Sequence, residues 1–367
     1  MAGGAGRIPT IARTLPQRPE VAAIGPVPAA RPGSVTIQDI ARAAGVHAAS
    51  VSRALRGLPG EVSEDTRRRI LKIAERMGYQ PNVLAASLRT RQTNLVAIIV
   101  TDIGNPVVGP MIQGLEAHLR RHQLLCMVVQ TAPSAAERRD IIVQLANRRV
   151  AGLAVLAAEK SDAMLEEIAR RQLPTVLVNR GFGESRFPSV VNDERASVEL
   201  VLRHLSELGH QRIAHIHGPL TASTGIGRHE AFQVLAPQYG FKRPVVLEAG
   251  AFTREAGAEA ARRLLKRRGE RPTALFASND LLALGALAVL KDEGIRVPKD
   301  MSLVGHNDMP LVDLVEPPLT TVRVAVERMT EEAARILWCA LNEQQAASSV
   351  VLPPTLVVRG STAPPVA

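Results

Sequence analysis

Apolar residues recur at helical spacing in three short segments near the N-terminal end of the chain. Segments 36–44, 48–56 and 63–77 each carry their apolar side chains on one face. Gly45 ends the first segment and Gly78 ends the third, as glycine commonly does after a helix. Three helices within about forty-five residues predict a small all-α domain of the helix-turn-helix kind, which reads DNA.

The pattern changes from residue 95 onward to short apolar strands that alternate with amphipathic helices. Strands that are apolar throughout predict parallel sheets covered by helices on both faces, with a ligand cleft at the carboxyl ends of the strands. The predicted strands are 95–100, 124–129, 152–156, 175–178, 212–216, 245–247, 274–277 and 302–304, and the helices assigned between the first of them are 111–121, 136–147 and 163–171.

Composition excludes several classes of protein. No apolar run reaches the roughly 18 residues that a membrane span needs. The first thirty-odd residues lack the apolar core of a secretory signal, so we expect a cytoplasmic protein. Cys126 and Cys339 lie far apart in apolar segments and predict reduced thiols rather than a disulfide or metal framework.

The net charge of +10 is concentrated near the N-terminus. Residues 1–33 hold four arginines and one glutamate, and residues 34–92 hold ten basic and five acidic residues. A basic N-terminal part is typical of a segment that meets a polyanion, although a solvated basic arm would have the same charge.

The second predicted helix has the composition of a recognition helix. Arg53 can pair two ways with a guanine edge, and Ala48 and Ala49 can offer only methyl contacts. Ser50 and Ser52 are suited to phosphate oxygens. An ordinary amphipathic helix with a solvent-facing arginine remains the competing interpretation.

A series of motifs then appears in a fixed order: Thr36-Ile-Gln-Asp-Ile-Ala, Gly45-Val, Ser50-Val-Ser-Arg53, Val62-Ser, Thr66-Arg and Met77-Gly-Tyr79-x-Pro81-Asn82. With them the chain resembles the lactose-repressor/galactose-repressor (LacI/GalR) family of bacterial transcriptional regulators, from Val35 to about Gly360. The resemblance assigns Thr36, His47, Asn82 and Ala85 to the DNA-binding surface as well. His47 replaces the serine usual at that helix start, which leaves the capping bond of that serine in question.

The segment that begins at Pro81 resembles the family's hinge helix, which folds when a dimer meets its operator. The resemblance implies that Leu88 is an apolar wedge inserted into the minor groove. The competing interpretation is that Leu84 and Leu88 are a core pair one helical turn apart.

The remainder of the chain is similar to the family's effector-binding core, a two-lobed α/β unit like the periplasmic sugar-binding proteins. The matching motifs include Leu208-Gly-His210-x-Arg212-Ile-Ala214 and Phe276-Ala-Ser-Asn279-Asp280. The resemblance implies an effector site made by Asn105, Val107, Thr224, Arg228, Phe252, Asn279 and Asn307.

Two departures from the family pattern bear on the effector. Asn307 replaces the carboxylate that commonly accepts sugar hydroxyls, and an amide repels an anion less. Both a sugar acid and a neutral sugar therefore remain candidates for the effector. Ala222 stands where the purine-responsive branch has an arginine, which argues against a nucleobase.

Two other functions compete with the regulator. An enzyme is disfavoured because the sequence has no nucleophile elbow, no phosphate-binding loop and no dinucleotide fingerprint after the first strand. A non-DNA-binding sugar-binding protein is disfavoured by the basic three-helix module. His204, His210, His215 and His217 could suggest a metal site, but no ligand pattern accompanies them, and we expect neither metal nor cofactor.

We therefore predict a regulator, most simply a repressor, that binds a pseudo-palindromic operator as a homodimer under the control of a small molecule, with the sign of that control left open. No leucine heptads follow Arg359, so a coiled-coil tetramer is not indicated. The predicted regions are a disordered arm (1–33), a helix-turn-helix domain (34–80), a hinge helix and linker (81–93), an effector-binding and dimerisation core (94–362) and a tail (363–367). Within the core, lobe 1 is assigned to 94–192 with 324–353, and lobe 2 to 193–323 with 354–362.

Overall fold

The computed structural model describes residues 35–56, 62–79, 93–182, 185–241, 243–344 and 348–366. The chain forms two units, Met1–Asn82 and Val83–Ala367. The arm and the predicted hinge contacts Asn82, Ala85 and Leu88 lie outside the described residues. No helix among the residues described is long and apolar enough to cross a membrane.

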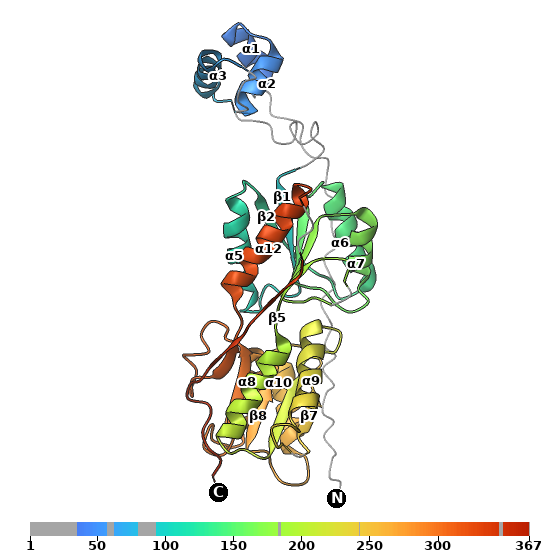
Figure 1. The fold of residues 1–367 in the computed structure, drawn as a ribbon, viewed down its shortest axis with the longest axis vertical. Coiled ribbons are helices and arrows are strands. Elements are labelled where there is room, and N and C mark those ends of the chain that lie inside the picture. The colour runs from blue at the N-terminus through green and yellow to red at the C-terminus, as the bar shows by residue number, and fades with distance from the viewer. Residues whose placement is uncertain are drawn as a thin grey trace, which may run out of the picture. The chain divides into compact units, whose positions relative to one another are not determined.

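The first unit contains three helices (Figure 1), α1 (Ile37–Ala44), α2 (Ala48–Arg56) and α3 (Glu64–Arg76). Thr36 begins α1 with a capping box: its hydroxyl accepts from the amide of Asp39, whose carboxylate accepts from the amide of Thr36. Gly45 ends α1 with a φ of 64°, a left-handed conformation that glycine adopts without strain. The core joins Ile40, Val51 and Ile70, one from each helix.

Ser63 stands where a serine commonly caps a helix, but it does not cap α3. It occupies the position before α3, but its hydroxyl makes no capping bond to the backbone and donates instead to the hydroxyl of Thr66, at 2.9 Å. Glu64 and Asp65 still place negative charge in the first turn of α3, where the helix dipole favours it.

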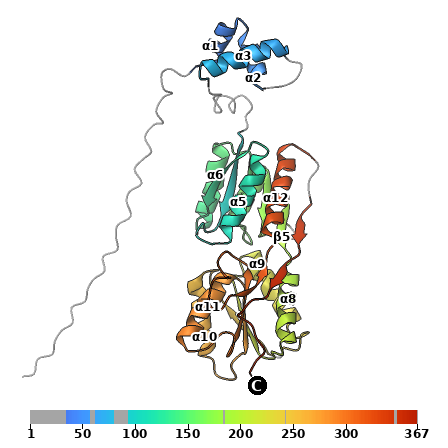
Figure 2. The same cartoon turned by 90° about the vertical axis from the view of Figure 1, so that its left-hand side faces the viewer.

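The second unit contains two six-stranded sheets, each covered by helices on both faces (Figure 2). The sheet of lobe 1 has the order β11-β5-β4-β3-β1-β2 and is parallel throughout. Its elements are β1 (Leu95–Val100), α5 (Val108–Arg120), β2 (Leu125–Gln130), α6 (Ala135–Asn147), β3 (Gly152–Val155), α7 (Ala163–Arg171), β4 (Thr175–Val178), β5 (Ser189–Asn192), α12 (Val326–Leu341) and β11 (Val350–Leu352).

The sheet of lobe 2 has the order β12-β10-β9-β8-β6-β7 and is parallel except for the β10–β12 pair. Its elements are α8 (Glu194–Glu207), β6 (Ile213–His217), α9 (Ser223–Leu235), β7 (Val245–Glu248), α10 (Arg254–Leu265), β8 (Ala274–Ala277), α11 (Asp280–Asp292), β9 (Ser302–Asn307), β10 (Thr320–Arg323) and β12 (Thr355–Val357).

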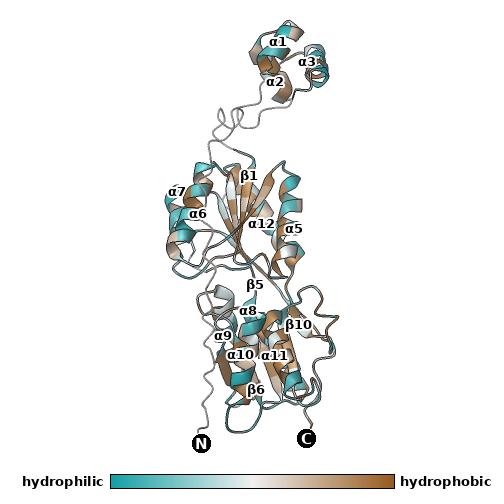
Figure 3. Ribbon diagram, turned by 180° about the vertical axis from the view of Figure 1, so that it is seen from behind, coloured by the Kyte–Doolittle hydropathy of each residue, from teal (hydrophilic) through white to brown (hydrophobic). Residues whose placement is uncertain are grey.

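Each sheet is buried between two apolar layers, as the hydropathy of the strands in Figure 3 indicates. In lobe 1, α5 and α12 cover one face and α6 and α7 the other. In lobe 2, α8 and α9 cover one face and α10 and α11 the other. The chain crosses between the lobes three times, after β5, after β10 and after β11.

The prediction of parallel sheets with helices on both faces is confirmed, and the eight assigned strands are present. The sequence did not predict β5, β10, β11 or β12. β5 and β10 contain polar residues, Ser189 and Asn192 in β5 and two threonines and an arginine in β10, which interrupt the apolar pattern. β11 is as apolar as the predicted segment 245–247, and its sequence does not explain why it was missed.

Candidate nucleic-acid interface and effector site

The outer face of α2 carries the residues predicted to meet DNA. Ala49 and Arg53 are exposed, while Val51 and Ala54 on the opposite face are buried in the domain core. The guanidinium of Arg53 forms no ion pair or hydrogen bond within the described residues. The helix thus presents a cation and small side chains outward, as a groove-reading helix requires.

His47 caps the start of α2, although it stands where the family usually has a serine. It precedes α2 and is exposed, and its Nδ1 accepts a hydrogen bond from the amide of Ala49 at 3.2 Å. The ring nitrogen therefore satisfies one of the otherwise unpaired amides at the helix start. Ala48 and Ser50 are half-buried beside it, and Ser52 is half-buried one turn further along.

Arg228 is the centre of a polar cluster in lobe 2. It lies on α9 and is 2% exposed. Its Nε and Nη2 donate to the two carboxylate oxygens of Glu194 at 2.6 and 3.0 Å, and its Nη1 donates to the carbonyl of Ser278. This two-point pairing fixes the guanidinium plane, and it leaves two of the five N–H groups of the side chain for another acceptor.

His306 and Asn307, at the end of β9, border the same cluster. His306 is fully buried, with its Nε2 3.6 Å from Glu194 and its Nδ1 3.1 Å from the amide oxygen of Asn307. Burial, with the nearby charge of Arg228, lowers the pKa of His306 well below its ordinary value, so the ring is neutral. Asn307 has a φ of 117° and is partly exposed.

Two other predicted effector contacts in lobe 2, Asn279 and Thr224, are buried. Asn279 is buried and caps α11, its side-chain oxygen accepting from the amide of Leu282 at 2.8 Å. Thr224 is buried in the first turn of α9. Asn279 precedes Asp280, whose carboxylate accepts from the hydroxyl of Thr321 at 2.6 Å.

Phe252 lies against the loop that follows β6. A Cβ on Gly218 would come within 2.2 Å of the Phe252 ring, so the ring rests directly on that glycine. From lobe 1 the guanidinium carbon of Arg180 lies 5.9 Å from the centre of the same ring, within cation–π range. The contact joins the two lobes, as do bonds from the amide of Lys160 to the carbonyl of Thr221 and from the amide of Gly181 to the hydroxyl of Ser223.

The two predicted contacts in lobe 1 follow β1. The side-chain oxygen of Asn105 accepts from the amide of Val107 at 3.2 Å, at the start of α5. Val107 is 8% exposed and belongs to the core of lobe 1. Asn105 is only partly buried and leaves its amide group available.

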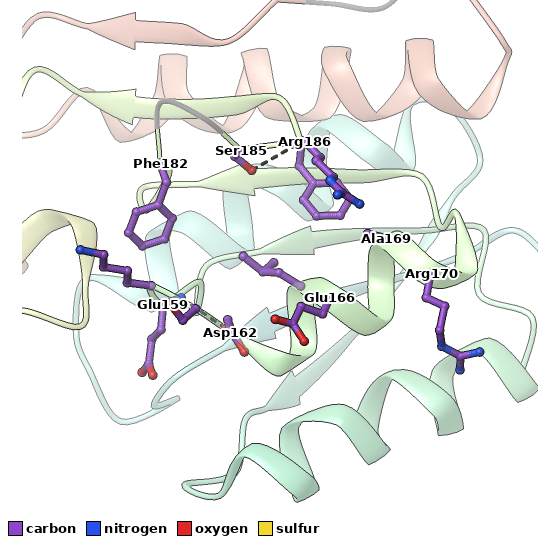
Figure 4. A pocket seen from close by; sticks show the side chains of 12 residues that line it. Glu159, Asp162, Glu166, Ala169, Arg170, Phe182, Ser185 and Arg186 are labelled. Atoms are coloured by element: carbon purple, nitrogen blue, oxygen red, sulfur yellow. Dashed lines mark hydrogen bonds between the residues drawn. The ribbon is translucent and has the colours of Figure 1, made fainter.

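A separate cavity of about 810 Å³ lies in lobe 1 between α7 and the segment after β4 (Figure 4). Its lining includes Leu165, Phe182 and Phe187, with Lys160 and Arg186 among its charged residues. None of the seven predicted effector residues lines it. The cluster around Arg228 and this cavity are therefore different places.

The histidines that could have suggested a metal site have other partners. Within the described part of the chain no three His, Cys, Asp or Glu side chains are grouped so as to hold a metal ion. His215 stacks on Phe232 and Phe276 at centroid distances of 4.4 and 4.8 Å, and burial lowers its pKa well below the ordinary value. His210 bonds to Thr273 and to the carbonyl of Ala363.

Comparison with known proteins settles the family. Residues 36–82 match the model of bacterial regulatory proteins of the lacI family, and residues 202–362 match a periplasmic binding protein-like domain. The chain is 32% identical to the HTH-type transcriptional regulator DegA of Bacillus subtilis over 338 residues, which cover 90% of this chain and 98% of DegA. It belongs to the lacI family of bacterial regulatory proteins. It is thus a transcriptional regulator with a DNA-binding helix-turn-helix domain.

Other members of the lacI family agree. The HTH-type transcriptional repressor CytR of Escherichia coli K12 is 31% identical over 332 residues, which cover 90% of this chain and 96% of CytR. Among solved structures, a complex of the transcriptional regulator CelR with cellobiose aligns with a TM-score of 0.69 at 29% identity, over 89% of this chain and 99% of that one. A lac repressor dimer bound to operator shares the fold, with a TM-score of 0.81 at 23% identity, over 90% of this chain and 99% of that one.

Sequence reasoning missed two residues that the structure brings to these sites. Glu194, the partner of Arg228, follows β5, and β5 itself was not predicted. Arg180 follows β4, at the carboxyl end of a predicted strand. Asn105 has the equivalent position after β1. Applying that positional rule to every predicted strand would have found Arg180.

Proposed function

We propose that this lacI-family regulator is a repressor that binds a pseudo-palindromic operator as a homodimer and responds to a small molecule bound between the lobes of its second unit. The observation that carries the proposal is the outward face of α2, where Arg53 and small side chains form a groove-reading surface in a lacI-type domain. The recognition surface would act in the cytoplasm, where the bacterial chromosome lies.

The cluster around Arg228 supports an effector with several hydroxyl groups. Arg228, Asn307 and His306 offer fixed donors and acceptors in lobe 2, and Phe252 contributes an aromatic ring where the lobes touch. Polar groups together with an aromatic ring are the usual composition of a polar small-molecule site. The similarity to a regulator solved with cellobiose favours the same class of ligand. A sugar or a sugar acid is therefore the proposed effector.

The position of Glu194 supports a structural link between the effector site and the crossovers between the lobes. Glu194 begins α8 directly after Asp193, where the chain passes from lobe 1 to lobe 2. The amide of Asp193 donates to the carbonyl of Leu352, on another of the three crossovers, at 2.9 Å. A ligand that repositions Arg228 and Glu194 therefore acts where the lobes are joined. The size of the change in DNA affinity is set by the difference between the ligand's affinities for two arrangements of the lobes.

Exposed apolar side chains support pairing with a second copy. Leu125 on the edge strand β2 is 61% exposed, and Leu311 and Leu314 in lobe 2 are 68% and 75% exposed. A twofold dimer could cover such side chains, and it would bring two recognition helices to a twofold-symmetric site. The relatives of this chain are regulators, which favours this function over an enzyme or a purely sugar-binding protein.

The test is selection of bound sequences from random duplex DNA by the full-length protein. The proposal predicts an enriched motif with two inverted half-sites, and a symmetric footprint on the chromosomal DNA that carries it. Enrichment of a single half-site would contradict the dimer. No enrichment at all would contradict specific DNA reading.

A further inference from the structure

The segments that lead into four parallel strands of lobe 2 are strongly basic. They run from the last turn of each preceding helix to the start of the strand: 204–212 before β6, 232–244 before β7, 262–273 before β8 and 289–301 before β9. Together they hold 12 Lys or Arg and 5 Asp or Glu residues. The rest of the chain after residue 92 holds 19 basic and 24 acidic residues. Positive charge is therefore concentrated in this part of an otherwise acidic unit.

These segments lie together because the strands are parallel and neighbouring. β7, β6 and β8 are adjacent in the sheet, so the residues before them share one edge of it. Ala214 on β6 is paired in register with Val245 on β7. Arg212 and Arg243 each lie two residues before that pair, and the Nε of Arg212 donates to the carbonyl of Arg271 at 3.4 Å. Each of the three adjacent strands is thus preceded by an arginine at this edge.

The side chains of these arginines, and of the turn after α10, are exposed. We call this group the basic edge; it consists of Arg212, Arg243, Lys266, Arg267, Arg268 and Arg271. The side chains of Arg267, Arg268 and Arg271 form no ion pair or hydrogen bond within the described residues. Their charges are therefore available to a partner.

The acidic residues of the four segments do not neutralise the basic edge. Glu270 lies 3.3 Å from Arg212, and Asp300 is paired with Arg296 at 2.7 Å. The other acidic residues are Glu207, Asp292 and Glu293. Because five carboxylates face 12 cations, a large excess of positive charge remains when every one of them is counted.

Helix stability explains only part of this charge. Arg262 and Arg263 lie in the last turn of α10, where the helix dipole favours cations. That effect is confined to about one turn, and Arg267, Arg268 and Arg271 follow the end of the helix. The fold of the described residues gives these three cations no partner of their own.

The basic edge is far from the effector cluster. Glu194, the partner of Arg228, begins α8, and Arg212 lies beyond the other end of this helix. A helix of 14 residues spans roughly 21 Å. The two places therefore lie at opposite ends of lobe 2, and a small molecule bound at one does not contact the other.

The backbone of duplex DNA fits such a surface. Phosphates form a regular row of negative charge, and arginine and lysine side chains are their usual partners. No phenylalanine or tyrosine ring is exposed in the described part of the four segments, which disfavours stacking on single-stranded bases. Val234 is the single large apolar side chain exposed there, whereas a membrane-binding surface usually presents several apolar anchors.

We propose that the basic edge binds the phosphate backbone of a second DNA segment while the helix-turn-helix domain binds the first. A protein held on DNA by that domain has further duplex beside it at high local concentration, so a weak second contact becomes effective. The second contact is independent of base sequence and is weakened by salt. One regulator thereby bridges two stretches of DNA.

The experiment measures capture of a second duplex by full-length protein that is already bound to its operator. Biotinylated operator is immobilised and saturated with protein, and a fluorescent duplex of random sequence is added at salt concentrations from about 50 to about 200 mM. The test variant loses three charges of the basic edge: Arg267→Gln, Arg268→Gln, Arg271→Gln. The charge-matched control loses three exposed arginines of lobe 1 whose side chains have no partner within the described residues: Arg121→Gln, Arg149→Gln, Arg328→Gln.

The wild type should capture the random duplex, with an affinity whose logarithm falls linearly with the logarithm of the salt concentration. The test variant should bind it at least about 10-fold more weakly at the lowest salt, with a salt slope smaller by about 2 to 3, since each lost phosphate contact removes about 0.9. The control should capture the duplex as the wild type does. Operator affinity, measured separately by anisotropy, should change by less than about threefold in both variants, since distant exposed charges are screened.

A wild type that captures no second duplex overturns the inference, as does a test variant that captures it with wild-type affinity and salt slope. Equal loss in the test variant and the control also overturns it, because net charge rather than the basic edge would then be responsible. Vesicles of phosphatidylserine and phosphatidylcholine are a further arm. Binding of the wild type to these vesicles without capture of DNA would assign the surface to a membrane and refute the inference.

Discussion

Arg53 and Arg228 illustrate two ways of using a guanidinium in one chain. Arg53 is exposed on α2 and has no partner within the described residues, so all of its donors can face a base edge. Arg228 is buried and donates three of its N–H groups to Glu194 and to the carbonyl of Ser278. The first arrangement suits recognition of a changing partner, and the second suits a fixed site whose orientation is set in advance.

Replacing Arg53 with alanine should relax base specificity. A bidentate contact to a base is worth about 1–3 kcal/mol, so binding to the best operator should weaken by that amount while binding to random DNA changes little. Fluorescence anisotropy with both DNAs measures the difference. Arg68→Ala on α3, where the side chain pairs with Asp65, is the control and should keep the base preference. An Arg53→Ala protein with unchanged operator preference would refute the role.

Removing the Arg228–Glu194 pair should uncouple the effector from DNA. Arg228→Ala alone leaves the carboxylate of Glu194, which is 14% exposed, without its partner, and broken buried pairs destabilise a fold by about 3–5 kcal/mol. The double variant Glu194→Gln with Arg228→Ala removes both charges and should keep operator affinity while losing the effector response. A double variant that binds operator and still responds to effector would place the response elsewhere.

At the scale of elements, the helices could be predicted from their periodic pattern and eight strands from short apolar runs. β5 and β10 were not predicted because polar residues interrupt them, and they take their places from sheet neighbours. Motifs singled out Arg228 and Asn307, which lie in the same cluster as Glu194 and His306, and their role as effector contacts stays a prediction. Asn279 was singled out in the same way, and its side chain caps α11. Glu194 was missed because only the fold brings α8 beside α9.

Helices α10 and α11 approach so closely that side chains are excluded from one position. A Cβ on Gly285 would lie 2.0 Å from the carbonyl oxygen of Arg254 and 2.7 Å from the amide of Ala258. Gly285→Ala should therefore lower the free energy of unfolding by about 1–3 kcal/mol, as overpacking does. Gly109→Ala in α5, where nothing lies within 4 Å, is the control and should cause no loss. Equal denaturation midpoints for the two variants would contradict the close approach.

Asp280 links α11 to the segments around Met309 and Thr321 and gives the core a pH dependence. Burial raises its pKa from 3.8 to about 7, with the charge of Asp308 acting in the same direction. The folded protein then holds the proton more tightly than the unfolded chain, so this group's contribution to stability is present below about pH 4 and is lost as the pH rises to about 7.

Asp280→Asn should remove that dependence. The amide oxygen can accept from Met309, and its NH₂ group can donate to Thr321, whose hydroxyl can turn. The stability of the variant relative to the wild type should increase between pH 4 and pH 7, on the order of 4 kcal/mol. Urea denaturation across that range measures the difference, and a pH-independent difference would refute the raised pKa.

The whole molecule places DNA reading and ligand binding in separate units of one chain. Control of one by the other requires that the effector bind two arrangements of the lobes with different affinity, typically a coupling of about 1–3 kcal/mol. The three crossovers join the lobes, and Glu194 follows the first of them at the start of α8. Binding of the effector between the lobes should therefore change the affinity for operator.

The most direct test is an anisotropy titration of the full-length protein on its selected operator and on random DNA, with and without each member of a panel of neutral sugars and sugar acids. We expect salt-sensitive binding that prefers the operator, and one ligand that shifts operator affinity by about 5- to 150-fold in the wild type but not in the Glu194→Gln, Arg228→Ala variant. Equal, weak binding to both DNAs, with a ligand still bound, would contradict the account and leave a sugar-binding protein in its place.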